Sequence, residues 1–154
     1  MIQKLVAAAC IVAEIEAKTK EAALKELLKN AHDAGLFGKK GLTALAKKLA
    51  ERESIGSTGL GNGVAVPHAK GDDVKETALV LARSKPGIEW QAIDGRPVHI
   101  MFLLVAPTGE PENHLQCLRW ISTLARSSDF RRFFLDARDE AALRELLREM
   151  TPKT

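Results

Sequence analysis

The sequence predicts a single α/β domain over residues 1–154, in which α-helices cover a mixed β-sheet. Two patterns indicate this fold class: apolar side chains recur at helical spacing before and after the middle of the chain, and short β-branched apolar runs lie between them. The 154 residues, 45% of them hydrophobic, suffice for one core. Because no internal repeat, low-complexity block or long linker divides the chain, we expect one domain.

The first two elements are expected to be amphipathic helices. Residues 20–34 carry an apolar stripe behind Thr19, a suitable N-cap, and Gly35 is a natural helix stop. Residues 40–52 repeat leucine and alanine at helical spacing, which predicts a second helix with Arg52 in its last turn.

The glycine-rich segment 56–63 separates these helices from the first strand. Its glycine density predicts a loop without regular structure. The apolar residues 64–66 then predict a short buried strand that ends at Pro67 and His68. We therefore expect His68 at the end of a strand and not inside a core.

Further strands are expected at residues 77–83 and 98–105, with the turn pair Asp94-Gly95 between them. Some antiparallel pairing is the simplest interpretation. After Pro107 the helical period returns, and it predicts helices over residues 111–127 and 139–150, with a short helical turn at 129–135.

The charge balance does not demand a nucleic-acid partner. The 23 Lys and Arg residues against 20 Asp and Glu give a net charge of +3, with the charges interspersed. One hypothesis is a local basic face, attractive to phosphate-bearing or acidic partners, made by Arg119, Arg126, Arg131 and Arg132. We interpret this face as a solvated helix surface, because aromatic residues are only 5% of the chain and no nucleic-acid motif accompanies it.

The two cysteines, Cys10 and Cys117, are too few for a disulfide framework, and no secretory signal opens the chain. We expect a cytoplasmic, reducing environment. The longest apolar runs, residues 5–13 and 100–106, are too short to cross a bilayer, so we expect a soluble protein linked to membranes only through a partner.

His68 is the most promising candidate for chemistry. A neutral imidazole is available near pH 7, and a glycine-rich segment before it can aim backbone N–H groups at a phosphoryl group. That segment lacks the Walker ending and the dinucleotide-binding spacing, which disfavours nucleotides. On spacing alone, a single histidine at a strand end is more often structural than catalytic.

Residues 52–69 closely resemble the phosphorylation-site signature of the fructose/mannitol/nitrogen-regulatory IIA family of the bacterial phosphotransferase system (PTS). The likeness continues through residues 88–98 and 102–107 to His114, so it covers nearly the whole chain and implies the fold of that family. By this resemblance His68 is the phosphorylated residue, His114 lies beside it, and Arg52 belongs to the same site. The segment 56–61 is most similar to the nitrogen-regulatory branch.

The resemblance implies that His68 attacks the phosphoryl group of a phosphohistidine carrier protein. Loop amides, Arg52 and His114 would hold the phosphoryl oxygens, with attachment expected at Nε2. The group then passes to a IIB component or acts as a signal to a transporter or kinase, and no cofactor is needed. The alternative is a non-catalytic regulatory module whose partner binding depends on phosphorylation.

Two other possibilities remain secondary. His32 and His99 have no matching partners in any motif, so they are interpreted as structural or surface residues; position 99 is usually acidic in the family, a departure that puts partner contacts in doubt. His68, His114 and Cys117 offer three potential zinc ligands, but no fourth ligand accompanies them, and no metal site is predicted.

Overall fold

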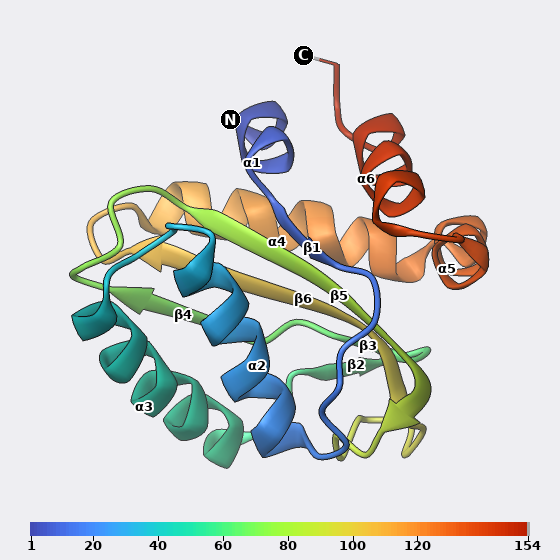
Figure 1. The fold of residues 1–154 in the computed structure, drawn as a ribbon, viewed down its shortest axis with the longest axis horizontal. Helices are drawn as coiled ribbons and strands as arrows, with labels where there is room; N and C mark the ends of the chain where they lie inside the picture. Colours follow the sequence, from blue (N-terminus) through green and yellow to red (C-terminus); the bar gives the residue numbers. More distant parts are fainter. Residues whose placement is uncertain (154) are drawn as a thin grey trace.

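The computed structural model describes residues 1–153 and has a six-stranded mixed β-sheet at its centre (Figure 1). In chain order, the elements of this described part are α1 (Ile2–Ala7), β1 (Cys10–Val12), α2 (Lys20–Asp33), α3 (Lys39–Ile55), β2 (Gly59–Gly61), β3 (Val64–Ala65), β4 (His68–Gly71), β5 (Ala78–Ile88), β6 (Val98–Pro107), α4 (Pro111–Arg126), α5 (Ser128–Asp136) and α6 (Glu140–Glu149). The predicted fold class is confirmed; the extent of the domain, 1–154, stays a prediction.

The two longest strands, β5 and β6, pair antiparallel along the middle of the sheet, with Val80 opposite Leu103. On one side β1 joins β5 in parallel, and on the other both β3 and β4 run parallel to β6. The hairpin partner β2 lies antiparallel to β3 at the edge. The expectation of a mixed sheet with antiparallel pairs is thus confirmed.

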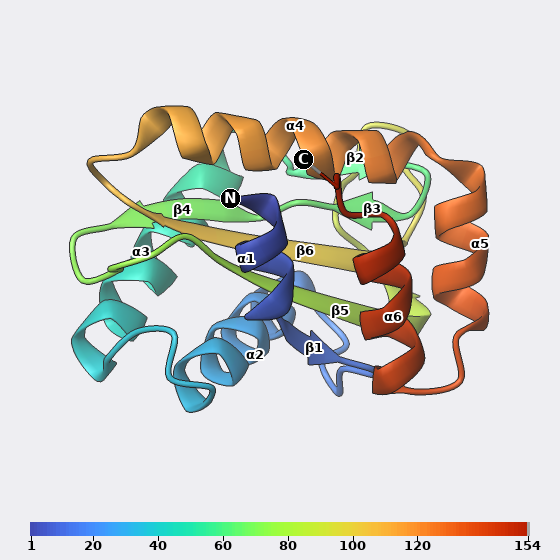
Figure 2. The ribbon, with the colours of Figure 1, turned by 90° about the horizontal axis from the view of Figure 1, so that it is seen from above.

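Helices cover both faces of this sheet (Figure 2). One face carries α2 and α3, and the other carries α1, α4, α5 and α6. A hydrophobic core lies on each face of the sheet, and alternate residues of β6 contribute to one or the other. Met101 and Leu103 pack toward α2 and α3, whereas Phe102 and Leu104 pack toward α4 and α5. This period of two explains why the strand sequences are continuously apolar, because neither face meets water.

The helices lie where their periodicity predicted them, with small shifts at the ends. The Thr19 hydroxyl caps α2 by accepting from the Ala22 N–H at 3.2 Å, and Gly35 follows with φ of 83°. The helix predicted to finish at residue 52 continues to Ile55, which keeps Arg52 in its last turn.

The N-terminal elements α1 and β1 were not predicted. The apolar run at residues 5–13 divides between a six-residue helix and a three-residue strand, each too short to show a period. Among residues 1–153, no helix is both long and apolar enough to cross a membrane.

The expectation that residues 56–63 lack regular structure is wrong. Gly59–Gly61 forms β2, which folds back on β3 through a turn where Gly61, Asn62 and Gly63 all have positive φ. The glycines serve the turn, and the flanking backbone is left free to pair. Gly59 is also needed because its backbone lies close to Ala92. A Cβ added at Gly59 would lie only 2.7 Å from the Ala92 Cβ.

The predicted strand 64–66 also needs correction. β3 contains only Val64–Ala65, and His68 does not follow a strand but begins the next one, β4. The break falls at Val66 and Pro67, since proline has no N–H for a strand ladder. The strand predicted at 77–83 extends to Ile88, past a register shift between Arg83 and Ile88.

Candidate functional site

Two histidines from different elements lie side by side on the α4 face of the sheet. His68 begins β4, and His114 stands in the first turns of α4. Their ring centroids are 5.6 Å apart and the rings are tilted by 54°. His68 is partly exposed, whereas only 6% of His114 is exposed. The structure therefore brings together two of the three residues that the sequence nominated.

The imidazole of His68 is held by its own backbone. Its Nδ1 lies 2.8 Å from the carbonyl oxygen of Val66. A carbonyl oxygen only accepts hydrogen bonds, so Nδ1 must carry the proton. In the neutral ring, Nε2 is then left with an unshared electron pair, which is the form that a nucleophile requires.

His114 has a different environment. Burial is the main cause that lowers its pKa, with smaller contributions from the neighbouring His68 and Lys70, and together they bring it to about 4. His114 is therefore a neutral imidazole at pH 7, with one N–H to donate. Its buried Nδ1 has no hydrogen-bond partner among the described residues.

Arg52 lies in the last turn of α3, and its expected place in the phosphate site stays a prediction. Its Nη1 donates to the carbonyl oxygen of Gly56 at 2.7 Å, across the end of α3. This contact satisfies a terminal helix carbonyl and suits the negative end of the helix dipole. The structure thus ties Arg52 to the start of the glycine-rich segment and records no bond from it to either histidine ring within residues 1–153.

Three amides of the glycine-rich segment already have acceptors in the protein. The N–H of Thr58 donates to Glu53, that of Gly59 to the Ser57 hydroxyl, and that of Asn62 to Asp94, at 3.2, 3.0 and 2.9 Å. These three N–H groups therefore already bond within the protein, and the expectation that loop amides hold phosphoryl oxygens stays a prediction.

Sequence reasoning missed a buried ion pair next to this segment. Lys20 at the start of α2 and Glu53 near the end of α3 approach to 2.5 Å, and Glu53 also bonds Thr58. The spacing of residues within one helix cannot predict this contact, because Lys20 and Glu53 lie in different helices, far apart in the chain. The one available signal was the position of Glu53 directly after Arg52 in the family signature.

The remaining histidines have structural contacts. His32 Nδ1 lies 2.9 Å from the Phe37 carbonyl oxygen, and His99 Nδ1 lies 2.9 Å from that of Ser84. The Cys117 sulfur contacts the Met1 sulfur at 3.5 Å. Within residues 1–153, no three His, Cys, Asp or Glu side chains gather as a metal-binding group.

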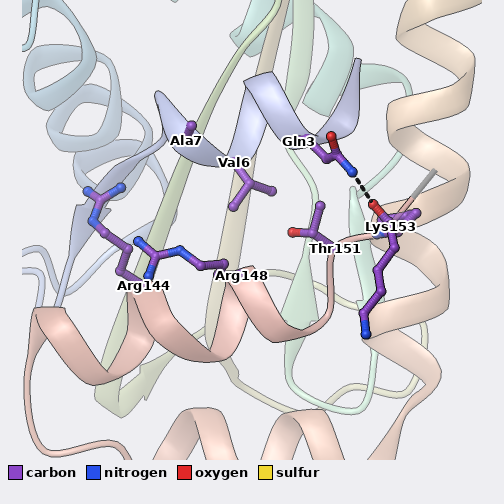
Figure 3. A pocket seen from close by; sticks show the side chains of 8 residues that line it. Gln3, Val6, Ala7, Arg144, Arg148, Thr151 and Lys153 are labelled. Carbon is purple, nitrogen blue, oxygen red and sulfur yellow. Dashed lines mark hydrogen bonds between the residues drawn. The ribbon is translucent and has the colours of Figure 1, made fainter.

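A cavity of about 310 Å³ lies between α1 and α6 (Figure 3). Its basic lining is largely engaged: Arg144 donates to the Ala9 carbonyl oxygen at 3.0 Å, and Arg148 pairs with Glu145 at 2.8 Å. None of the nominated residues lines it. The histidine pair is therefore the better candidate site.

Known proteins share both the sequence and this fold. The profile of the family described as "Phosphoenolpyruvate-dependent sugar phosphotransferase system, EIIA 2" matches residues 4–150. The chain therefore belongs to this EIIA family.

Its relatives carry two kinds of name. The chain is 36% identical over 132 residues to the PTS system fructose-specific EIIA component of Haloferax volcanii, covering 86% of this chain and 84% of that protein. It is 35% identical over 146 residues to the nitrogen regulatory protein of Bradyrhizobium diazoefficiens, covering 95% and 94%. It is 33% identical over 148 residues to the fructose-specific EIIABC component of Bacillus subtilis, covering 96% of this chain but only 23% of that protein.

Solved structures agree on the architecture. The nitrogen regulatory protein IIA-Ntr of Neisseria meningitidis superposes with a TM-score of 0.78 at 25% identity, covering 95% of this chain and 98% of that one. The mannitol IIA of Escherichia coli superposes with a TM-score of 0.74 at 20% identity, covering 89% and 94%, and supports the fold alone.

Proposed function

We propose that this protein is a phosphoryl carrier that accepts the group on Nε2 of His68 from a phosphohistidine carrier protein. The observation that carries the proposal is the bond from Nδ1–H of His68 to the Val66 carbonyl, which in the neutral ring leaves the unshared electron pair on Nε2 of a partly exposed side chain. Membership of the EIIA family supports the choice of phosphoryl over other groups.

The transfer needs no proton donor or cofactor. The electron pair of His68 Nε2 forms the new N–P bond while the N–P bond of the donor histidine breaks, and the donor nitrogen keeps the bonding pair. Catalysis in such an exchange is a matter of position and of stabilising charge on the three phosphoryl oxygens.

In this proposal His114 and Arg52 stabilise those oxygens. The neutral His114 ring, 5.6 Å from that of His68, donates its single N–H. Arg52 uses one N–H on Gly56 and has further guanidinium donors for an incoming phosphate. We assign His114 the role of hydrogen-bond donor and not of a second nucleophile.

The destination of the group is a IIB component or a regulated protein. Relatives with sugar-transport and with nitrogen-regulatory names match at similar identity, 36% and 35%. The second candidate function is therefore a signalling module in which the charge added at His68 controls partner binding. Pull-downs with the phosphorylated and unphosphorylated protein test it, and equal recovery of partners in both states contradicts it.

The carrier function is tested by incubating the protein with phosphoenolpyruvate, enzyme I and the phosphohistidine carrier. Acid-labile phosphate is then mapped by mass spectrometry on wild type, on His68→Ala, and on His32→Ala as a histidine control from α2. We expect phosphate on His68 in wild type and in the control, and none in His68→Ala. Full labelling of His68→Ala contradicts the assignment.

A further inference from the structure

A closed polar network lies beneath the glycine-rich segment, on the α2 and α3 side of the sheet. At its centre the Lys20 ammonium and the Glu53 carboxylate approach to 2.5 Å, with side chains that are 11% and 7% exposed. Thr58 and Trp90 complete it, at 3% and 0% exposure. The network joins the start of α2, the end of α3, the glycine-rich segment and the connection between β5 and β6.

Its polar groups satisfy one another. The Thr58 hydroxyl donates to Glu53 and accepts from the indole N–H of Trp90 at 3.2 Å, while the Thr58 N–H donates to the second Glu53 oxygen. Lys20 donates to the Trp90 carbonyl oxygen at 3.2 Å and lies 5.6 Å from the indole ring centroid. Buried ion pairs contribute little net stability compared with apolar packing, so their use points to geometric control.

A chain of hydrogen bonds leads from this network to the nucleophile. Glu53 holds both the N–H and the hydroxyl of Thr58. The Thr58 carbonyl accepts from the Val66 N–H at 3.0 Å, and the Val66 carbonyl accepts from Nδ1–H of His68 at 2.8 Å. The position of the carbonyl that orients His68 therefore depends on the carboxylate of Glu53, through two intervening residues.

We infer that Glu53 is a positioning residue for His68, acting through Thr58 and Val66 to hold the imidazole with its proton on Nδ1. This inference deepens the proposed phosphoryl-carrier function and rests on it for its catalytic consequence. Lys20 serves by fixing the Glu53 carboxylate, since the buried pair leaves it little freedom to rotate. A purely structural network would stabilise the fold and leave the tautomer of His68 unaffected.

The test compares Glu53→Gln with Glu51→Gln, an exposed glutamate on the same helix. In Glu53→Gln, an NH₂ that cannot accept hydrogen bonds replaces one of the two carboxylate oxygens that accept from Thr58, and the negative charge that pairs with Lys20 is lost. The first readout is the nitrogen NMR spectrum of histidine-labelled, unphosphorylated protein, which reports the tautomer of His68. The second is the rate of phosphorylation by the phosphohistidine carrier.

We expect wild type and Glu51→Gln to show the Nδ1–H tautomer of His68, and Glu53→Gln to show a mixture. The phosphorylation rate should fall by about 10- to 100-fold in Glu53→Gln, because misplacement by ~1 Å costs about that factor. An unchanged tautomer in Glu53→Gln overturns the inference, whether or not the rate falls, since a slower rate alone would reflect stability or donor docking. A changed tautomer at the wild-type rate also overturns the positioning role.

A second pair of variants keeps the inference testable if Glu53→Gln does not fold. Thr58→Val preserves shape and removes the hydroxyl, whereas Thr58→Ser keeps it and should restore the wild-type tautomer and rate. Equal behaviour of the two contradicts the inference. If wild type accepts no phosphate, the carrier proposal fails, and the tautomer measurement still decides whether Glu53 orients His68.

Discussion

At the scale of single residues, the two site histidines differ in how far their rings are buried. His68 stands partly in solvent, while His114 is 94% buried behind it. Burial disfavours the imidazolium form of His114, and a neighbouring positive ring would disfavour it further. Near pH 7, His114 is therefore a neutral hydrogen-bond donor beside the partly exposed ring of His68.

A first prediction concerns the titration of His114. In the unphosphorylated protein its pKa should be about 4, as measured by NMR chemical shifts across pH. After phosphorylation of His68, the adjacent negative charge should favour the imidazolium and raise the pKa of His114. A pKa that stays unchanged on phosphorylation would place the phosphoryl group away from His114.

A second prediction concerns Arg52, whose guanidinium spans the end of α3. Arg52→Lys keeps the charge but loses the planar fork that binds oxygens at two points. We expect phosphorylation of His68 to slow by about tenfold, which corresponds to ~1.4 kcal/mol in the barrier. Rapid-quench kinetics measure it, with Lys47→Arg on the same helix as control. Equal rates in wild type and Arg52→Lys would restrict Arg52 to helix capping.

At the scale of elements, a buried arginine fastens the C-terminal end of α5 to the sheet. Arg83 is 2% exposed and donates to the carbonyl oxygens of Ala13, Phe134 and Ala137, at 3.0, 3.0 and 2.7 Å. Because α5 finishes at Asp136, the carbonyls near its C-terminal end lack regular helix partners, and within the described residues that of Phe134 accepts only the capping N–H of Ala137, at 3.4 Å, besides Arg83. One side chain thus connects β5, the segment after β1 and α5.

Arg83→Met tests this connection. Methionine replaces the aliphatic stem but removes the guanidinium donors from the three carbonyls, so we expect a loss of about 2–4 kcal/mol in the free energy of unfolding. Urea denaturation measures it. Arg132→Met, an exposed arginine in α5 itself, should change stability by less than about 0.5 kcal/mol. Similar losses in both variants would contradict the proposed fastening.

Most elements were predictable because each carries its own local signal. The long helices show periodicity and caps such as Thr19, and β6 shows an apolar run. The unpredicted elements depend on partners distant in sequence: β1 exists because residues 10–12 pair with β5, and β2 because it pairs with β3. Short strands have no local period, so only tertiary contacts reveal them.

The site was predictable to a different degree. The pairing of His68 with His114 followed from the resemblance, and the structure places the rings together. The bond from His68 to Val66 and the buried Lys20–Glu53 pair did not follow, because both depend on where the backbone breaks and folds back. A sequence motif identifies residue types and leaves such hydrogen bonds unspecified.

At the scale of the whole molecule, His114 links stability to pH. Its pKa is about 6.5 in the unfolded chain and about 4 in the folded protein, so between these values the unfolded state binds more protons. Stability contributed by the neutral ring is therefore full above pH 6.5 and is lost as pH falls toward 4, by up to about 3 kcal/mol.

Denaturation at pH 7.5, 5.5 and 4.5 checks this dependence. His114→Gln should flatten the part of the stability profile between pH 4 and 6.5, whereas His32→Gln should leave it unchanged. Parallel profiles for wild type and His114→Gln would contradict the linkage of stability to this ring.

The break between β3 and β4, which both pair with β6, restricts the number of residues that can lie between them. Ala65 lies opposite Met101 and His68 opposite Leu104, so the same offset is kept on both sides of the gap at Val66 and Pro67. Strand side chains alternate between faces, which makes parity decisive. Deleting or inserting one residue in the gap, with β3 kept in place and β4 shifted by one residue along β6, would place His68 opposite Leu103 or Val105 and turn the imidazole toward α2 and α3, on the opposite side of the sheet from His114. We therefore expect the proposed phosphorylation of His68 to be more sensitive to a change of one residue in the length of this gap than to substitutions within it.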